Sequence, residues 1–230
     1  MSRRGDIRCG NNHPALDFRA GTGQGDGIAK PSRMNIPSTL PPLILASASP
    51  RRAELLREQG LAFTVVTSEV DEVTPEGLSP RELCQLNAHQ KARAVARHHP
   101  DALVLGADTL VFLGSEILGK PADLGAARRM LHQLQGRTHE VVTGVSLLQW
   151  RPRREQLFAV STRVRFRALS AAQIESYLAA VDTLDKAGAY AIQEHGEWLV
   201  ETIDGSFTNV VGLPVEQVVA AIQAWNTPDA

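Results

Sequence analysis

The sequence predicts an α/β protein with a mixed sheet, and three observations carry this prediction. In the first half, short apolar runs of the buried-strand type alternate with helical patterns. In the second half, two long segments have strand character, and one of them shows the period of two that is typical of antiparallel strands with one solvated face. Capping signals precede most of the helical patterns. We therefore expect helices packed on the faces of a mixed sheet.

The first half is expected to alternate strands with helices. Apolar runs predict strands at 43–46, 63–66 and 102–107, and the polar pair Asp108 and Thr109 is expected to end the last of them. Start signals and breakers predict three helices, which run from Ser49 to Gly60, from Ser79 to about 98–100, and from Asp123 to Gly136.

The second half is expected to contribute antiparallel strands. Segments 139–148 and 157–167 flank a turn-like stretch at 151–154, and apolar residues alternate with arginines along the second segment. The remaining predicted elements are a helix behind the capping box of Ser170 and Gln173, a strand at 198–203 and a helix at 214–225.

Composition limits the classes of protein. The 230 residues suit one large domain or at most two small ones. A formal net charge of −1 provides no overall field toward nucleic acid or an anionic membrane, so any anion site must be local. There is no apolar run of roughly 18 residues, and the basic start lacks the apolar stretch of a signal peptide. Cys9 and Cys84 favour free thiols over a disulfide. We expect a cytoplasmic protein.

Residues 1–40 are expected to be a flexible glycine-rich tail, and residues 41–230 a single domain. The tail shows no apolar period and cannot bury enough surface to offset its ordering entropy. Its glycine-rich stretch at 21–27 matches neither GxGxxG nor GxxxxGK[ST]. A phosphate loop there is the less favoured alternative.

The junction at 47–52 is the first candidate site. A strand-to-helix junction presents free backbone N–H groups and the positive end of a helix, which suit a phosphate. Arg51 and Arg52 lie in the first helical turn, where positive charge is unfavourable for the helix dipole, so a bound anion would explain them. A solvated first turn is the alternative.

Carboxylates form the second candidate site. Asp108 follows the strand at 102–107, and carboxylates at strand ends often line a ligand crevice. A simple turn or N-cap aspartate is the alternative. Glu69, Asp71 and Glu72 follow another strand. If one of them approached Asp108, the pair could hold Mg²⁺ or Mn²⁺; otherwise they are solvated turn residues.

Two lysines and one glutamine complete the candidates. Lys91 lies among small apolar residues and Lys120 in a constrained loop, so each could bind phosphate as a point charge or be a surface lysine with a buried stem. Gly188 indicates a close backbone approach, and the amide of Gln193 could recognise a base edge.

Other chemistries find no support. The histidines form no HExxH pattern for zinc, and there is no GxSxG elbow or cysteine-centred catalytic motif. Arg151, Arg153 and Arg154 beside Trp150 could contact nucleic acid, but a solvated hairpin tip is favoured.

Six fragments in order resemble one known family. The chain is similar to the Maf-like nucleoside triphosphate pyrophosphatases over roughly residues 43–225. The resemblance implies a mixed sheet with helices on its faces and a two-lobed cleft, similar to the inosine triphosphate pyrophosphatases. The fragments are SASPRR at 47–52, GADT at 106–109, GKP at 119–121, HEVVTG at 139–144, DKAGAY at 185–190 and NVVGLP at 209–214.

The resemblance also implies a reaction. A nucleoside triphosphate would be hydrolysed to the monophosphate and pyrophosphate, with Asp108 as the general base that activates water. Glu72 and Asp108 would hold a divalent cation, Mg²⁺ or Mn²⁺. The cations implied to hold the triphosphate are Arg51, Arg52, Lys91 and Lys120.

Family members that resemble this chain with Arg51, Thr109 and Gln193 in these places favour dTTP and UTP. A sister group that acts on 7-methyl-GTP carries a different segment in place of 185–193. The resemblance therefore favours the pyrimidine group and makes a homodimer plausible. The near-neutral charge predicts no stable nucleic-acid binding. The alternatives are a 7-methyl-GTP pyrophosphatase and a non-catalytic nucleotide- or DNA-binding regulator of septation.

Overall fold

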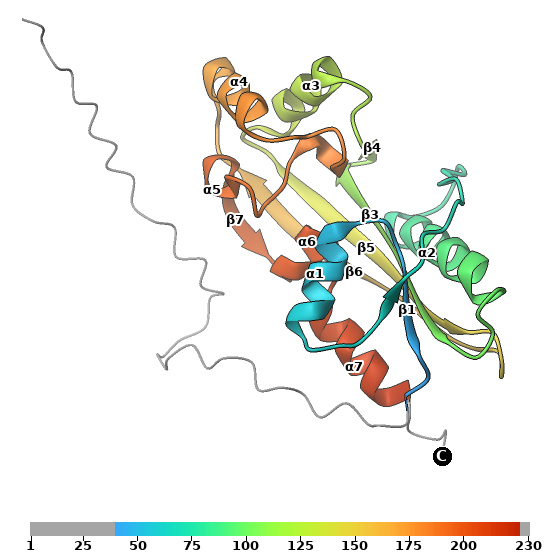
Figure 1. The fold of residues 1–230 in the computed structure, drawn as a ribbon. Coiled ribbons are helices and arrows are strands. Elements are labelled where there is room, and N and C mark those ends of the chain that lie inside the picture. The colour runs from blue at the N-terminus through green and yellow to red at the C-terminus, as the bar shows by residue number, and fades with distance from the viewer. Residues whose placement is uncertain (1–39, 226–230) are drawn as a thin grey trace, which may run out of the picture. The chain divides into compact units, whose positions relative to one another are not determined.

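A computed structural model describes residues 40–225 (Figure 1). All of them belong to one compact unit. The predicted tail at 1–40 lies outside the described residues, apart from Leu40. None of the helices in the described range is long and apolar enough to cross a membrane.

The sheet is mixed, as predicted, and residues 40–225 contribute seven strands to it. Its order is β2-β1-β3-β5-β6-β7, with β4 paired to β3. The first strand pairs in parallel with the second and third, and every other pair is antiparallel. The strands are β1 (Leu43–Ala46), β2 (Thr64–Val65), β3 (Leu103–Leu113), β4 (Glu116–Leu118), β5 (Thr138–Gln149), β6 (Arg154–Phe166) and β7 (Val200–Asp204).

The helices begin where the capping signals predict. Ser79 and Ser170 each form a complete capping box, with Glu82 and Gln173 respectively. Asp123 accepts a hydrogen bond from the backbone N–H of Ala126. The helices are α1 (Pro50–Glu58), α2 (Pro80–Ala96), α3 (Leu124–Leu134), α4 (Ala171–Ala180), the 3₁₀ turn η1 (Ala187–Ala189), α5 (Gly196–Leu199), α6 (Phe207–Val211) and α7 (Val215–Trp225).

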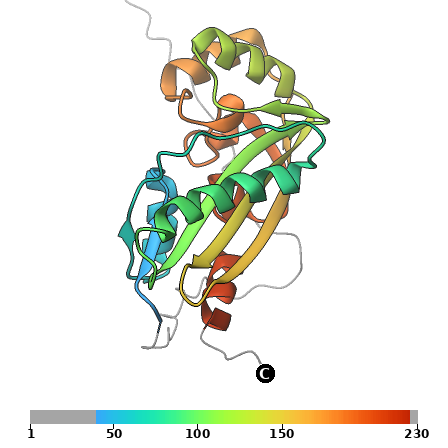
Figure 2. The ribbon, with the colours of Figure 1, turned by 90° about the vertical axis from the view of Figure 1, so that its right-hand side faces the viewer.

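Helices cover both faces of the sheet. In Figure 2, α2 lies across β3 and β5, and in Figure 1 α1 and α7 lie on the opposite side of the sheet. The strands alternate accordingly, since Val104 packs with the α2 side and Leu105 with the larger core that contains α1 and α7. This division places α2 against β3 and β5 on one face of the sheet.

Two glycines let α2 approach the sheet closely. A Cβ on Gly144 would lie 2.2 Å from the backbone oxygen of Cys84, and one on Gly106 would lie 2.4 Å from that of Ala88. Gly144 is the register partner of Asp108 across the β3–β5 ladder. The missing side chains therefore bring α2 down onto the strand where Asp108 stands.

The predicted end of the strand at 102–107 is wrong. β3 continues through Asp108 and Thr109 to Leu113, because the apolar run from Leu110 resumes the strand and α1 and α2 supply partners for both polar side chains. The hairpin strand β4 and the short helix α6 were not predicted. The strand expected at 198–203 begins at Val200, since 196–199 form α5.

Candidate active site

A cavity of about 670 Å³ opens beside the centre of β3. Its wall comes from the β1–α1 junction, from the segment after β2, and from the segments around Gly119, 185–193 and Gly212. The structure brings every predicted site residue into this wall: Arg51, Arg52, Glu72, Lys91, Asp108, Thr109, Lys120 and Gln193. The predicted cleft corresponds to this cavity.

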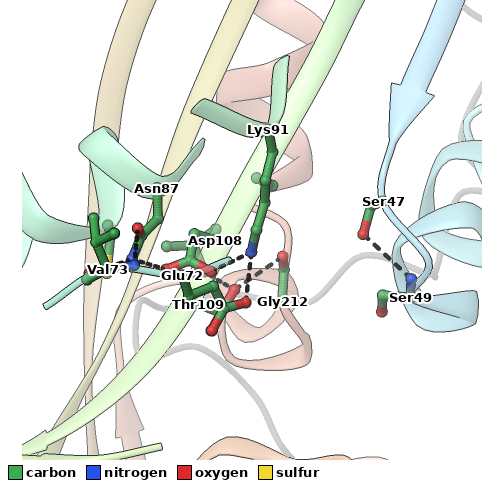
Figure 3. A network of polar contacts seen from close by, with 12 residues as sticks. Ser47, Ser49, Glu72, Val73, Asn87, Lys91, Asp108, Thr109 and Gly212 are labelled. Atoms are coloured by element: carbon green, nitrogen blue, oxygen red, sulfur yellow. Dashed lines mark hydrogen bonds and ion pairs between the residues drawn. The ribbon is translucent and has the colours of Figure 1, made fainter. Parts of the chain in front are cut away.

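An ammonium joins the two candidate carboxylates (Figure 3). Nζ of Lys91 donates to Oδ1 of Asp108 at 2.6 Å and to Oε1 of Glu72 at 2.7 Å. The side chain of Asp108 is 3% exposed and that of Glu72 is 43% exposed. The site thus pairs a buried carboxylate with one that faces the opening, and a single cation holds both.

Asn87 was not predicted as part of the site. Its Nδ2 donates to Oδ2 of Asp108 at 3.3 Å, and its Oδ1 accepts from the backbone N–H of Val73 at 3.0 Å (Figure 3). Asn87 precedes Lys91 by one helical turn, so both side chains lie on the same face of α2. In the sequence, an amide among the small apolar residues of a helix was the signal that could have identified Asn87 as a site residue.

The charge of Glu72 is stabilised by its surroundings. Partial burial raises the pKa of this carboxyl, but the hydrogen bond and charge of Lys91 and the charge of Lys120 outweigh it, and the pKa is lowered overall. Glu72 is therefore an anion at neutral pH. Glu69 and Asp71, the other acids of this segment, are exposed and do not line the cavity.

Arg52 is built into the cavity wall. Its guanidinium donates to the carbonyl oxygens of Gly212 and Ala107 at 2.8 and 2.9 Å, and to the hydroxyls of Ser47 and Thr109 at 3.0 and 2.9 Å. One of its five N–H groups is left over. Burial lowers the pKa of Arg52, although Asp108 and Glu72 oppose this effect. The guanidinium of Arg52 therefore links α1 to β3 and to the end of α6.

The hydroxyl of Thr109 is occupied by protein partners. Besides Arg52, it lies 2.9 Å from the hydroxyl of Thr143 and 3.3 Å from the carbonyl oxygen of Gly212. Ser47 in turn accepts from the backbone N–H of Ser49 at 3.2 Å, which ties down the β1–α1 junction (Figure 3). These bonds hold in place the part of the cavity wall at the start of helix α1.

The other two cations face the opening. Nη1 of Arg51 donates to Oδ2 of Asp185 at 2.9 Å. Lys120 is exposed and forms no hydrogen bond or ion pair with another residue in the range 40–225. Both charges are thus available to a ligand in the cavity.

The backbone next to Gln193 is anchored by the side chain of Tyr177. The hydroxyl of Tyr177 accepts from the backbone N–H of Ala191 at 3.0 Å and donates to its carbonyl oxygen at 3.3 Å. Gly188 has φ of 70°, and a Cβ there would lie 3.0 Å from Val111, which confirms the predicted close approach. The exposed amide of Gln193 therefore stands on a fixed backbone.

Chemistry based on cysteine or histidine is not supported at this site. Burial, with a smaller effect of the Asp108 charge, raises the pKa of the Cys84 thiol to about 12, so it is no nucleophile at neutral pH. Within residues 40–225 no group of three or more His, Cys, Asp or Glu side chains could hold a metal.

The predicted hairpin tip at 151–154 lies outside the cavity wall. Its Arg154 stacks on the ring of Trp225, with the guanidinium carbon 4.6 Å from the ring centroid.

The donor set nevertheless suits one type of cation. Mg²⁺ is commonly held by one or two carboxylates together with substrate phosphates and water. Glu72 and Asp108 supply two carboxylates close enough to share one ammonium. The residues present therefore fit a hard divalent cation that arrives with a phosphate ligand.

The sequence of this chain is similar to those of several known proteins. A dTTP/UTP pyrophosphatase of Akkermansia muciniphila is 48% identical over 80% of this chain and 96% of its own length. One from Myxococcus xanthus is 48% identical over 85% of this chain and 97% of its own, and one from Moorella thermoacetica is 52% identical over 76% and 91%. The family model described as Maf-like protein matches residues 42–225. This chain therefore belongs to the Maf-like protein family.

Proposed function

We propose that this protein hydrolyses the nucleoside triphosphates dTTP and UTP to the monophosphate and pyrophosphate. The observation that carries the proposal is the buried carboxylate of Asp108, held between Lys91 and Asn87 at the wall of a cavity with cations on several sides. The relatives that match over more than 90% of their own length carry the name dTTP/UTP pyrophosphatase.

Asp108 is the group that activates water. Its carboxylate is held by a hydrogen bond on each oxygen, so its orientation toward the cavity is fixed before the substrate binds. Each carboxylate oxygen retains a second lone pair, which can accept a proton from a water molecule. Deprotonation of that water as it attacks phosphorus is general base catalysis.

The cations divide into two tasks. Arg51, Lys91 and Lys120 neutralise the triphosphate, whose charge must be stabilised as the bond to the leaving pyrophosphate breaks. Arg52 has most of its N–H groups on protein acceptors, so it shapes the wall and offers the substrate a single donor and a positive charge.

A divalent cation, Mg²⁺ or Mn²⁺, completes the proposal. Glu72 and Asp108 would hold it, and when bound it would neutralise phosphate charge and orient the substrate. Treatment with a chelator should abolish hydrolysis, and added Mg²⁺ or Mn²⁺ should restore it. Full activity after exhaustive chelation would contradict a metal requirement.

Selectivity for the pyrimidine is assigned to Arg51, Thr109 and Gln193, which all line the cavity. The exposed amide of Gln193 has both a donor and an acceptor for a base edge. The hydroxyl of Thr109 is engaged within the protein, so Thr109 acts by shaping the wall.

A nucleotide panel tests the function. The purified protein should release pyrophosphate from dTTP and UTP with Mg²⁺ or Mn²⁺, and much less from 7-methyl-GTP. Preference for 7-methyl-GTP would place it in the sister group. Release of orthophosphate from a triphosphate would contradict the reaction, and nucleotide binding without turnover would support a regulator.

We further propose a cytoplasmic enzyme that forms a homodimer and makes no stable complex with nucleic acid. The near-neutral chain supports the last point, because it has no overall positive field. Light scattering measures the mass in solution, and a DNA-binding assay at low salt tests for a nucleic-acid partner.

A further inference from the structure

An ion pair closes one side of the cavity. Arg51 lies in the first turn of α1, and Asp185 lies between α4 and η1, 134 positions further along the chain. Nη1 of Arg51 donates to Oδ2 of Asp185 at 2.9 Å, and both residues line the cavity. The pair therefore joins the β1–α1 junction to the segment that carries Gln193.

Asp185 is itself held in place. Its Oδ1 accepts from Nζ of Lys186 at 2.8 Å, and Lys186 is only 6% exposed. The same ammonium donates to the carbonyl oxygen of Asp182 and lies 3.5 Å from Oε1 of Glu194. The carboxylate of Asp185 thus has a fixed direction, set by a buried cation from its own segment.

Arg51 depends on this one contact. Among residues 40–225, Asp185 is the sole hydrogen-bonding partner of its side chain. An arginine side chain has about 2 kcal/mol of rotamer entropy, so an unpaired guanidinium would sample many positions. The contact uses one of five N–H groups and leaves the rest for a ligand.

Stability does not explain the pair. The two side chains are 23% and 51% exposed, and ion pairs at such positions contribute roughly 0–1 kcal/mol to folding. Partial burial raises the pKa of Asp185, but hydrogen bonds from Lys186 and Arg51 outweigh it and the pKa is lowered overall. Asp185 is therefore an anion at neutral pH and pairs with Arg51 whenever the site is empty.

We propose that Asp185 is a positioning residue, which orients the guanidinium of Arg51 toward the nucleotide and couples it to the segment that carries Gln193. The inference rests on the proposed function, because the nucleotide is the ligand that Arg51 meets. Asp185 acts through Arg51 alone and does not contact the reacting atoms. Its removal therefore weakens nucleotide binding while leaving the chemical step intact.

The experiment compares Asp185→Ala with the wild-type protein. We expect KM for UTP to rise about tenfold while kcat changes by less than about twofold, because a binding contact present equally in ground and transition states is lost. The dissociation constant of a UTP analogue with a non-hydrolysable α,β-imido bridge, measured by calorimetry with Mg²⁺, should rise by a similar factor. The melting temperature should change little, because the buried ammonium of Lys186 keeps the carbonyl oxygen of Asp182 and the carboxylate of Glu194 as partners.

Two further variants separate positioning from a general effect. In the background of Arg51→Ala, adding Asp185→Ala should cause no additional rise in KM or in the dissociation constant, because the effect passes through Arg51. The matched control is Asp204→Ala, which removes an exposed ion pair with Arg163 outside the cavity, 2.8 Å long against 2.9 Å for Arg51 and Asp185, and it should behave as wild type.

The outcomes distinguish the two proposals. If the wild-type protein neither hydrolyses UTP nor binds the analogue, the proposed function fails and the inference falls with it. If the wild type is active but Asp185→Ala matches it, or if the two substitutions are fully additive, the positioning role alone is overturned.

Discussion

The ammonium of Lys91 lies 2.6 Å from Oδ1 of Asp108, and the two side chains come from different layers of the fold. Lys91 stands on α2 and Asp108 in the middle of β3, so the contact exists only because the helix packs closely on the sheet. The position of the Asp108 carboxylate therefore depends on the packing of α2 on β3.

The substitution Asp108→Asn should remove activity with little effect on folding. An asparagine can still accept the hydrogen bond from Lys91, but it cannot take a proton from water. We expect kcat for UTP to fall by about 10²–10⁴-fold. Pyrophosphate release measures the loss, and Asp101→Asn at an exposed loop serves as control. Activity close to wild type would show that another group activates water.

The substitution Lys91→Met should destabilise the protein. It leaves the nearly buried carboxylate of Asp108 without its cation, and loss of one partner of a buried pair costs about 3 kcal/mol. Urea unfolding measures the free energy. The double variant Lys91→Met with Asp108→Asn should recover part of the loss, because no buried charge is then left unpaired and the other partner of Lys91, Glu72, is 43% exposed. Equal stability of the single and double variants would contradict this explanation.

Stability should decline with acid because of His139. Burial lowers the pKa of this imidazole to about 4, from an unfolded value near 6.5. The unfolded chain therefore binds a proton that the folded chain does not, and this contribution to stability is complete above about pH 6.5 and lost as the pH falls toward 4. The loss is of order 3 kcal/mol.

The variant His139→Gln should flatten the pH dependence between about 4 and 6.5, since nothing titrates at that place. The free energy of unfolding is measured by urea titration at several pH values. His132→Gln on the exposed side of α3 is the control and should keep the wild-type slope. An unchanged slope in His139→Gln would assign the acid sensitivity to other groups.

The substitution Gly144→Ala should separate α2 from the sheet. Its Cβ would lie 2.2 Å from backbone atoms of Cys84, which cannot move without shifting the helix. We expect a loss of about 3 kcal/mol in the free energy of unfolding. Activity should fall as well, because Lys91 and Asn87 would lose contact with Asp108.

Gly119→Ala is the matched control for stability, because a Cβ there meets no atom within 4 Å. Its free energy of unfolding should stay within about 0.5 kcal/mol of wild type. If Gly144→Ala unfolded at the same urea concentration as the wild type, the close approach of α2 would not be required.

Local chemistry was sufficient to predict most elements. The capping boxes at Ser79 and Ser170 and the alternation along 157–167 depend on residues within a few positions of each other, so they are visible in the sequence. Five of the candidate site residues stand in short contiguous motifs, namely Arg51, Arg52, Asp108, Thr109 and Lys120. What the motifs could not show is which of these residues contact one another.

The tertiary structure decided three points that neighbours in sequence do not encode. Asp108 and Thr109 looked like the end of a strand, and they continue β3 because Lys91, Asn87 and Arg52 satisfy them from other elements. Arg52 is largely occupied by protein acceptors, whereas Arg51 next to it meets Asp185 from a distant segment.

The physical reason is packing. Periodicity, caps and breakers act over one or two turns of chain, so the sequence by itself determined most of the elements and most of the candidate site residues, but not β4, α6 or Asn87. How those residues share charges depends on how closely the layers approach, and here Gly106 and Gly144 allow α2 to reach the sheet. The order of strands, the partner of each cation and the depth of Asp108 follow from that contact between distant parts of the chain.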